Sequence, residues 1–228
     1  MPFRKEEYSV GKEALVIGAT GLVGKSLVHK LLNEQAYSKI TILVRNDLSI
    51  RHSKLNTVKV DFDRLENRKD EFAVDDVFCC LGTTIKKAGS REAFRKVDYD
   101  YPIQAAILAK EQGANQFLVI SSMGASLESP FFYSQVKGEL EGKLKSISFS
   151  ALHIFRPSLL LGEREEFRFG EKAAELLSKA LPFLFTGKMN KYKPISADRV
   201  AEGLIKAALQ NEAGTHLYES NDINTLLY

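Results

Sequence analysis

The chain has 228 residues, of which 44% are hydrophobic and 27% are charged. This composition excludes a disordered or low-complexity protein and suits one domain, or one domain with a small appendage. The formal net charge is only +3, with 32 basic residues scattered among 29 acidic ones, so we expect no nucleic-acid partner. No apolar run approaches the ~18 residues of a membrane span, and the first residues contain no apolar signal core, so we expect no membrane association.

The cysteines and histidines indicate neither a disulfide nor a metal. Cys79 and Cys80 are adjacent within an apolar run and are the only cysteines in the chain, so we interpret them as buried strand residues. Their use predicts a reduced, cytoplasmic protein. The four histidines are dispersed without the spacing of metal ligands, so we predict no metal site.

Apolar runs alternate with helical patterns along the whole chain. The predicted strands cover residues 14–18, 39–45, 57–62, 76–81, 116–121, 150–155 and 215–219. The predicted helices cover 22–35, 101–112, 132–146 and 197–209, with one more near 171–180. This alternation predicts an α/β fold of the Rossmann type, a doubly wound parallel sheet with helices on both faces. We predict one domain over 1–228, in which 163–194 form a small C-terminal substrate lobe or a lid.

A glycine-rich turn follows the first predicted strand, in the stretch ALVIGATGLVG. Gly18, Gly21 and Gly24 recur at every third position and lead into a helical pattern. Glycines there allow a tight turn and a close approach of the backbone to a pyrophosphate, while the free N–H groups of the helix face the anion. The stretch therefore predicts a dinucleotide site, with a purely structural turn as the alternative.

The residues after the second and third predicted strands bear on the choice of nucleotide. The second strand ends in Val44-Arg45-Asn46 and has no carboxylate at its tip for a ribose 2′-hydroxyl. Because a guanidinium suits a 2′-phosphate, Arg45 favours NADP, although a solvated arginine would also fit. Asp61, after the third strand, suits the adenine amino group or a helix cap equally well.

Tyr133 and Lys137 lie four residues apart at the start of a predicted helix, on one face. A free tyrosine has a pKa near ~10, and a neighbouring ammonium favours its phenolate, which suits proton transfer near neutral pH. The lysine is also placed to hold the nicotinamide ribose. Ser121 and Ser122 end the preceding strand, and we predict that Ser122 positions a substrate oxygen, while one of the two serines only serves the turn. Pro157, after the sixth strand, fixes the loop over the nicotinamide or simply ends the strand.

The stretches GATGLVG, SS, YSQVK and FRPSLLLG together resemble the short-chain dehydrogenase/reductase superfamily. The longer blocks FCCLGTTIKKAG, VDYDYPIQAAILAKEQGANQFLVISSMGAS, YSQVKGELEGKL and FRPSLLLGERE resemble its atypical, Tat-interacting-protein-like branch, over about residues 13 to 210. That resemblance implies an NADPH-binding Rossmann domain with a catalytic Tyr/Lys pair at Tyr133 and Lys137. Met123 stands at the place where some extended enzymes of the superfamily carry their serine.

The resemblance also implies further contacts to the cofactor. It assigns the phosphate loop to residues 20–23, the adenosine phosphate to Arg45 with Asn46, and the rest of the cofactor to residues near 81–82, 160 and 163–168. The family more often has a second arginine where Asn46 stands. The residues that we expect to bind the cofactor, from the pattern and the resemblance together, are Gly18, Thr20, Gly21, Leu22, Val23, Gly24, Arg45, Asn46, Asp61, Leu81, Gly82, Ser121, Tyr133, Lys137, Pro157, Leu160 and Arg168.

These features predict an NADPH-dependent oxidoreductase that acts on a carbonyl/alcohol pair. Tyr133 is the expected proton donor, and Lys137 and Ser122 assist it. The alternative is an NADPH-binding regulatory or scaffold protein with little turnover, as eukaryotic relatives of this family are described. An isomerase or epimerase with tightly held NAD is disfavoured by Arg45. We expect a small-molecule carbonyl substrate, and the sequence leaves a protein partner or a homodimer open.

Overall fold

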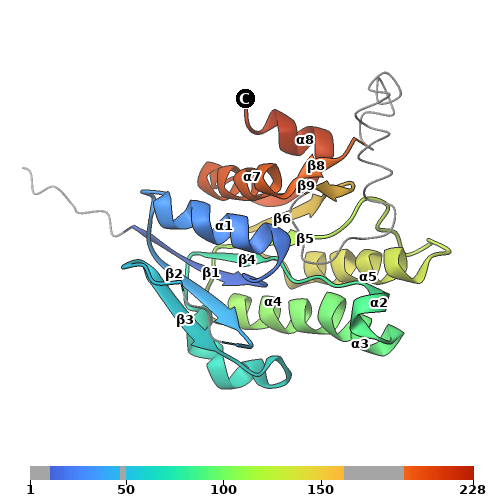
Figure 1. The fold of residues 1–228 in the computed structure, drawn as a ribbon, viewed down its shortest axis with the longest axis horizontal. Coiled ribbons are helices and arrows are strands. Elements are labelled where there is room, and N and C mark those ends of the chain that lie inside the picture. Colours follow the sequence, from blue (N-terminus) through green and yellow to red (C-terminus); the bar gives the residue numbers. More distant parts are fainter. Residues whose placement is uncertain (1–10, 47–49, 162–192) are drawn as a thin grey trace, which may run out of the picture.

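Seven parallel strands form the central sheet of the protein. The computed structural model describes residues 11–46, 50–161 and 193–228. The strands of the central sheet are β1 (Lys12–Ile17), β2 (Tyr37–Val44), β3 (Leu55–Lys59), β4 (Asp76–Cys79), β5 (Gln116–Ile120), β6 (Ala151–Arg156) and β9 (Gly214–Glu219) (Figure 1). Two short strands, β7 (Leu160–Leu161) and β8 (Ile195–Ser196), pair with each other beside it.

Helices connect these strands. They are α1 (Leu22–Asn33), the 3₁₀ segment η1 (Phe62–Phe72), α2 (Ile85–Ala88), α3 (Arg91–Arg95), the π-helical turn η2 (Lys96–Asp100), α4 (Tyr101–Glu111), α5 (Phe132–Ile147), α7 (Ala197–Gln210) and α8 (Ser220–Thr225). Gly113, with φ of +84°, follows α4 and provides the left-handed residue at which that helix was predicted to stop.

The strand order is β3-β2-β1-β4-β5-β6-β9. The chain adds β2 and β3 on one side of β1 and then crosses over to add β4 and the later strands on the other side, so the switch point lies between β1 and β4. Every pair in this sheet is parallel. Such a switch point leaves a crevice at the carboxyl ends of the two strands, where open α/β sheets bind their ligands. The chain is closely joined there, because the amide of Cys80 donates to the carbonyl of Ile17 over 2.8 Å.

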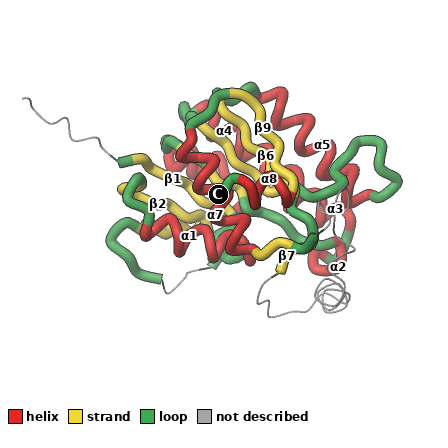
Figure 2. Tube along the Cα trace, turned by 90° about the horizontal axis from the view of Figure 1, so that it is seen from above, coloured by secondary structure: helices red, strands yellow, loops and turns green. Residues whose placement is uncertain are grey.

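The helices form one layer on each face of the sheet. Figure 1 shows α1 and α7 over one face and α4 and α5 over the other. Seen from above, α1 and α7 lie side by side, with α8 against α7 (Figure 2). The sheet is therefore covered on both faces, which explains why β2 carries an almost continuous apolar run instead of an alternating one.

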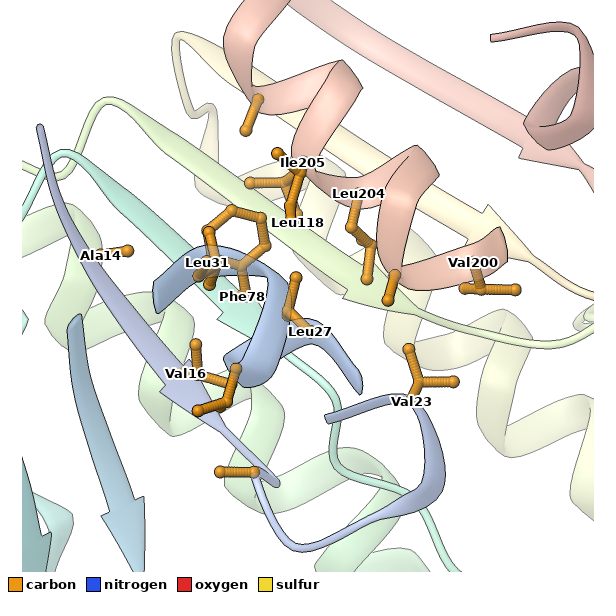
Figure 3. Packing of buried hydrophobic residues seen from close by; sticks show 14 of the residues in the cluster. Ala14, Val16, Val23, Leu27, Leu31, Phe78, Leu118, Val200, Leu204 and Ile205 are labelled. Atoms are coloured by element: carbon orange, nitrogen blue, oxygen red, sulfur yellow. The ribbon is translucent and has the colours of Figure 1, made fainter. Parts of the chain in front are cut away.

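The core under α1 and α7 shows how the two helices are held to the sheet. Leu27 and Leu31 of α1 and Leu204 of α7 meet Val16 of β1 and Phe78 of β4 (Figure 3). All five side chains are at most 1% exposed. Burial of each contributes about 1.5–3 kcal/mol, so this packing fixes where α1 begins, at the end of β1.

The predicted Rossmann-type α/β fold is confirmed, with corrections at element ends. The third strand covers Leu55–Lys59 instead of 57–62, because Asp61 already caps η1 by accepting a hydrogen bond from the amide of Asp63 at 3.0 Å. The fourth strand ends at Cys79, two residues earlier than predicted. The predicted lobe or lid at 163–194 and the helix near 171–180 lie outside the described residues, except for 193–194.

Candidate functional site

A cavity of about 150 Å³ lies at the carboxyl ends of the strands, at the switch point between β1 and β4. The predicted site residues that line it are Gly21, Leu22, Val23, Leu81, Gly82, Ser121, Ser122, Tyr133, Lys137, Pro157 and Leu160. It is also lined by residues that the sequence reasoning did not select, namely Cys80, Thr83, Asp98, Ile120, Ser158 and Leu159. A larger and more open groove, of about 450 Å³, lies at the amino ends of the strands, whereas open α/β sheets bind their ligands at the carboxyl ends.

The glycine-rich loop between β1 and α1 is packed so tightly that two of its glycines have no room for a side chain. Gly18 has φ of +83°, and a Cβ there would come within 2.6 Å of the backbone of Cys80. A Cβ on Gly24 would overlap the carbonyl oxygen of Gly18. The backbone at Gly18 is thus packed between the residue that follows β4 and the first turn of α1.

The start of α1 is arranged as an anion site. Gly21 is its N-cap residue and offers no side-chain cap, and the first turn contains no acidic residue. The free N–H groups at the start of the helix therefore face the cavity without an internal acceptor, beside the positive end of the helix dipole. A pyrophosphate fits this arrangement, so the start of α1 is suited to the pyrophosphate of a dinucleotide.

The residues predicted at the adenosine end lie apart from this cavity. Arg45 and Asn46 follow β2 and are exposed, so they are available to a ligand that extends over the sheet edge. Asp61 is exposed as well, and its carboxylate serves the start of η1 as described above. Thr20, in the glycine-rich loop, is also exposed, whereas Arg168 lies outside the described residues.

Helix α5 presents Tyr133 and Lys137 to the cavity from successive turns. The ring of Tyr133 packs against the ring of Phe94 in α3, with centroids 5.3 Å apart. Lys137 is only 2% exposed, and its Nζ lies 2.8 Å from Oδ1 of Asp98 in η2. The α3–η2 segment therefore contacts both members of the Tyr/Lys pair, Tyr133 through α3 and Lys137 through η2.

The charge of Lys137 is maintained against its burial. Burial by itself lowers the pKa of a lysine, but the Asp98 carboxylate and the Tyr133 oxygen outweigh that effect and raise the pKa of Lys137 above its ordinary value. Asp98 is completely buried, and its second oxygen accepts a hydrogen bond from the amide of Thr83 at 2.8 Å. The site thus contains a desolvated ammonium beside the tyrosine hydroxyl.

The two serines at the end of β5 have different surroundings. The hydroxyl of Ser121 donates to Oε1 of Glu141 over 2.6 Å, and the same carboxylate accepts from Arg156 at 2.9 and 2.6 Å. The hydroxyl of Ser122 is buried and has no hydrogen-bond partner among the described residues. A buried hydroxyl without a partner is costly, so the Ser122 oxygen is the one that a ligand in this cavity would satisfy.

The loop after Ser122 lies directly on α5. A Cβ on Gly138, the neighbour of Lys137, would come within 2.5 Å of the backbone of Ser126 and 2.6 Å of that of Leu127. The glycine lets the loop and the helix meet at backbone distance, which fixes the place of Ser122 relative to Lys137.

The cysteines are structural. Burial raises the pKa of the Cys79 thiol to about 11, and burial also raises that of Cys80. Both thiols are therefore protonated at neutral pH and poor nucleophiles. Cys79 is the buried strand residue that was predicted, whereas Cys80 lies just after β4, is half-buried and lines the cavity.

Asp98 is the main residue of the candidate site that sequence reasoning missed. The predicted helix began at residue 101, so the preceding turn was treated as a connection. The sequence carries a signal for its burial but not for its direction, because Phe94, Asp98 and Pro102 recur at intervals of four. The structure buries all three. An aspartate within such an apolar stripe indicates a buried carboxylate with a partner.

Comparisons with known proteins bear on the family of the chain. A family profile described as NAD(P)H-binding matches residues 18–155. Protein HTATIP2 of Rattus norvegicus is 40% identical over 183 residues, which cover 78% of this chain and 75% of the relative. The mitochondrial protein FMP52 of Candida albicans is 40% identical over 156 residues, 66% of this chain and 68% of its own length. FMP52 of Eremothecium gossypii, also named mitochondrial, is 31% identical over 219 residues, with 94% and 96% covered.

These relatives correct the expected location. The prediction of a cytoplasmic protein is wrong by this comparison, because the FMP52 relatives are named mitochondrial. Composition and cysteine use had no means of telling one reducing compartment from another. Within residues 11–46, 50–161 and 193–228, no helix is long and apolar enough to cross a membrane.

Solved structures share the fold at low sequence identity. The ADP-L-glycero-D-manno-heptose-6-epimerase of Helicobacter pylori superposes with a TM-score of 0.70 at 15% identity, covering 99% of this chain and 83% of its own. MoeE5 in complex with UDP-glucose and NAD superposes with a TM-score of 0.68 at 14% identity, covering 93% and 80%. At these identities the likeness shows the fold alone.

Proposed function

Because the chain belongs to the NAD(P)H-binding family that includes relatives of HTATIP2 and FMP52, we propose that it is an NADPH-dependent oxidoreductase acting on a carbonyl/alcohol pair. The observation that supports this most is the meeting of three groups in one cavity beside the glycine-rich loop. These are the Tyr133 hydroxyl, the buried Lys137 ammonium and the Ser122 hydroxyl, which has no hydrogen-bond partner in the described part of the chain.

The residues present fit a nicotinamide dinucleotide along the carboxyl edge of the sheet. The start of α1 would hold the pyrophosphate, with Gly18 and Gly24 permitting its approach. Leu81 and Gly82 would lie along the cofactor, and Lys137 would hold the ribose of its nicotinamide half. When bound, the nicotinamide supplies or accepts the hydride.

The side chains of the cavity would manage the proton. In reduction, Tyr133 donates its hydroxyl proton to the carbonyl oxygen as that oxygen gains negative charge. The positive charge of Lys137 stabilises the phenolate left behind, and the low exposure of Lys137 makes that interaction strong. Ser122 donates a hydrogen bond to the same substrate oxygen and places it against Tyr133.

The preference for NADPH is proposed from Arg45. Its guanidinium is exposed at the tip of β2, where a carboxylate would select NAD by binding the ribose 2′-hydroxyl. An arginine there offers several donors to a 2′-phosphate instead. Asn46 adds an uncharged amide where relatives more often place a second arginine, so we expect Arg45 to carry most of the contact.

The test is a Tyr133→Phe variant. It should bind NADPH with unchanged affinity, measured by the cofactor's own fluorescence, and lose about 100-fold or more of kcat on any carbonyl that the wild type reduces. Tyr101→Phe is the matched control, because the Tyr101 hydroxyl bonds Asp63 at an exposed site outside the cavity.

Two results would contradict the proposal. Full activity of Tyr133→Phe on a verified substrate would exclude the proton-transfer role. Tight NADPH binding by the wild type without turnover of a broad panel of aldehydes and ketones would favour the regulatory or scaffold protein instead.

A further inference from the structure

We propose that Asp98 is a positioning residue of this site, whose buried carboxylate fixes the Lys137 ammonium and keeps it charged beside Tyr133. The proposal rests on the proposed function for the use of that charge, whereas the ion pair itself is a feature of the chain. Asp98 is completely buried, Lys137 is 2% exposed, and 2.8 Å separates Oδ1 from Nζ.

The backbone around Asp98 is shaped for this contact. Asp98 lies in the middle of η2, the π-helical turn that joins α3 directly to α4, in which the amide of Tyr101 bonds the carbonyl of Lys96. One extra residue in that turn widens the helix and turns its side chains away from the positions that a regular α-helix gives. Such turns are rare and occur frequently at functional sites, so the position of this turn beside Lys137 independently supports a role for Asp98 in the site.

The carboxylate is itself anchored on its far side. Its Oδ2 accepts from the amide of Thr83, directly after the stretch of residues 80–82 that lines the cavity. Its Oδ1 has no hydrogen-bond partner among the described residues and is met by the Lys137 ammonium as an ion pair. Asp98 therefore links the loop after β4 to α5, and the ammonium is the partner that satisfies its remaining charge.

The groups around Lys137 make Asp98 its main source of negative charge. The Lys137 ammonium is faced by Asp98 from η2, by Tyr133 from the same helix, α5, and by the Cys79 thiol from β4. Of the two carboxylates that follow Lys137 on α5, Glu139 pairs with Arg95. The other, Glu141, is engaged by Ser121 and Arg156. Without Asp98, the desolvated ammonium would lose its proton far more easily.

The experiment is an NMR titration of the lysine side chains in the wild type and in Asp98→Asn, with Lys137→Met to assign the signal. We expect Lys137 to titrate above an ordinary lysine in the wild type, because of the Asp98 carboxylate, and to titrate well below the wild-type value in Asp98→Asn. Asp98→Glu should restore most of the difference. Glu139→Gln is the control, because it removes the exposed Arg95–Glu139 pair (2.6 Å), which also joins α3 to α5.

Kinetics then separate positioning from simple structural support. In Asp98→Asn, kcat should be near normal at low pH and should fall roughly tenfold for each pH unit above the point at which Lys137 now titrates. KM should change less than kcat. A merely structural role would lower kcat by the same factor at every pH. An unchanged pH profile would overturn the proposal.

The titration distinguishes this inference from the proposed function. If the wild-type Lys137 titrates below an ordinary lysine, or if Asp98→Asn titrates like the wild type, Asp98 does not hold the charge. If the titration shifts as expected but the wild type reduces no carbonyl, the proposed function fails while the assignment of Asp98 to Lys137 stands. The wild-type measurement keeps the test decisive even if Asp98→Asn does not fold.

Discussion

Folding stability should depend on pH through His153, a buried histidine far from the cavity. Its Nδ1 lies 3.1 Å from the Tyr218 hydroxyl and its Nε2 lies 3.2 Å from Oε1 of Gln116. Its ring stacks on that of His216, with centroids 5.0 Å apart. Burial above all, and then the charges of His216 and Lys12, lower the pKa of His153 to about 4.

The sign and size of the effect follow from that value. The unfolded chain binds a proton at His153 below a pH of about 6.5, while the folded protein does not until about pH 4. The free energy of unfolding is therefore fully retained at pH 7 and decreases as the pH falls through this window. With 1.36 kcal/mol for each unit of difference in pKa, the total is about 3 kcal/mol, of which about 2 kcal/mol is lost by pH 5.

The assay is urea unfolding followed by circular dichroism at several pH values between 7 and 5, for the wild type and for His153→Gln. Because carboxylates also titrate, the quantity to compare is the difference in unfolding free energy between the two proteins. It should shift by about 2 kcal/mol in favour of His153→Gln on acidification. A difference that stays constant over this range would refute the reasoning, and the exposed His52→Gln variant should follow the wild-type curve.

Two further predictions concern the cofactor. Gly24→Ala should destabilise the fold by about 1–3 kcal/mol and abolish measurable NADPH binding, because its Cβ would overlap the Gly18 carbonyl oxygen. The control, Gly142→Ala on the open face of α5, should do neither. Urea unfolding and fluorescence titration check both variants. Arg45→Ala should weaken NADPH binding about 10- to 100-fold and leave NADH affinity within about twofold, as measured by the same titration. A wild type that prefers NADH would contradict the second prediction.

The parts of the fold that depend on local pattern were predictable from the sequence. The strand that runs into Gly18, the helix after Gly21 and the stop at Gly113 each depend on residues within a few positions of one another. Hydrophobic periodicity and the conformational freedom of glycine are local properties, so a linear reading captures them. The strand that ended early, near Asp61, shows the limit, because a capping aspartate and a strand end look alike in sequence.

The candidate site was predictable only in part, because its decisive contacts are distant in sequence. The spacing of Tyr133 and Lys137 places them on one face, but the partner of Lys137 lies in η2, 39 residues before it. A π-helical turn leaves no pattern that distinguishes it from an α-helix, so the direction of Asp98 was beyond sequence reasoning. The choice between Ser121 and Ser122 depended likewise on Glu141, which the helix brings to only one of them.

The close contact at Gly138 bears on how much entropy cofactor and substrate binding must remove. Because the loop after Ser122 rests on the backbone of α5, the serine, the tyrosine and the lysine belong to one packed unit. Their relative freedom was lost when the chain folded, so binding does not have to restrict it again. A larger residue at position 138 would separate the loop from the helix. It would disturb the catalytic geometry more than it would weaken the affinity for the nucleotide.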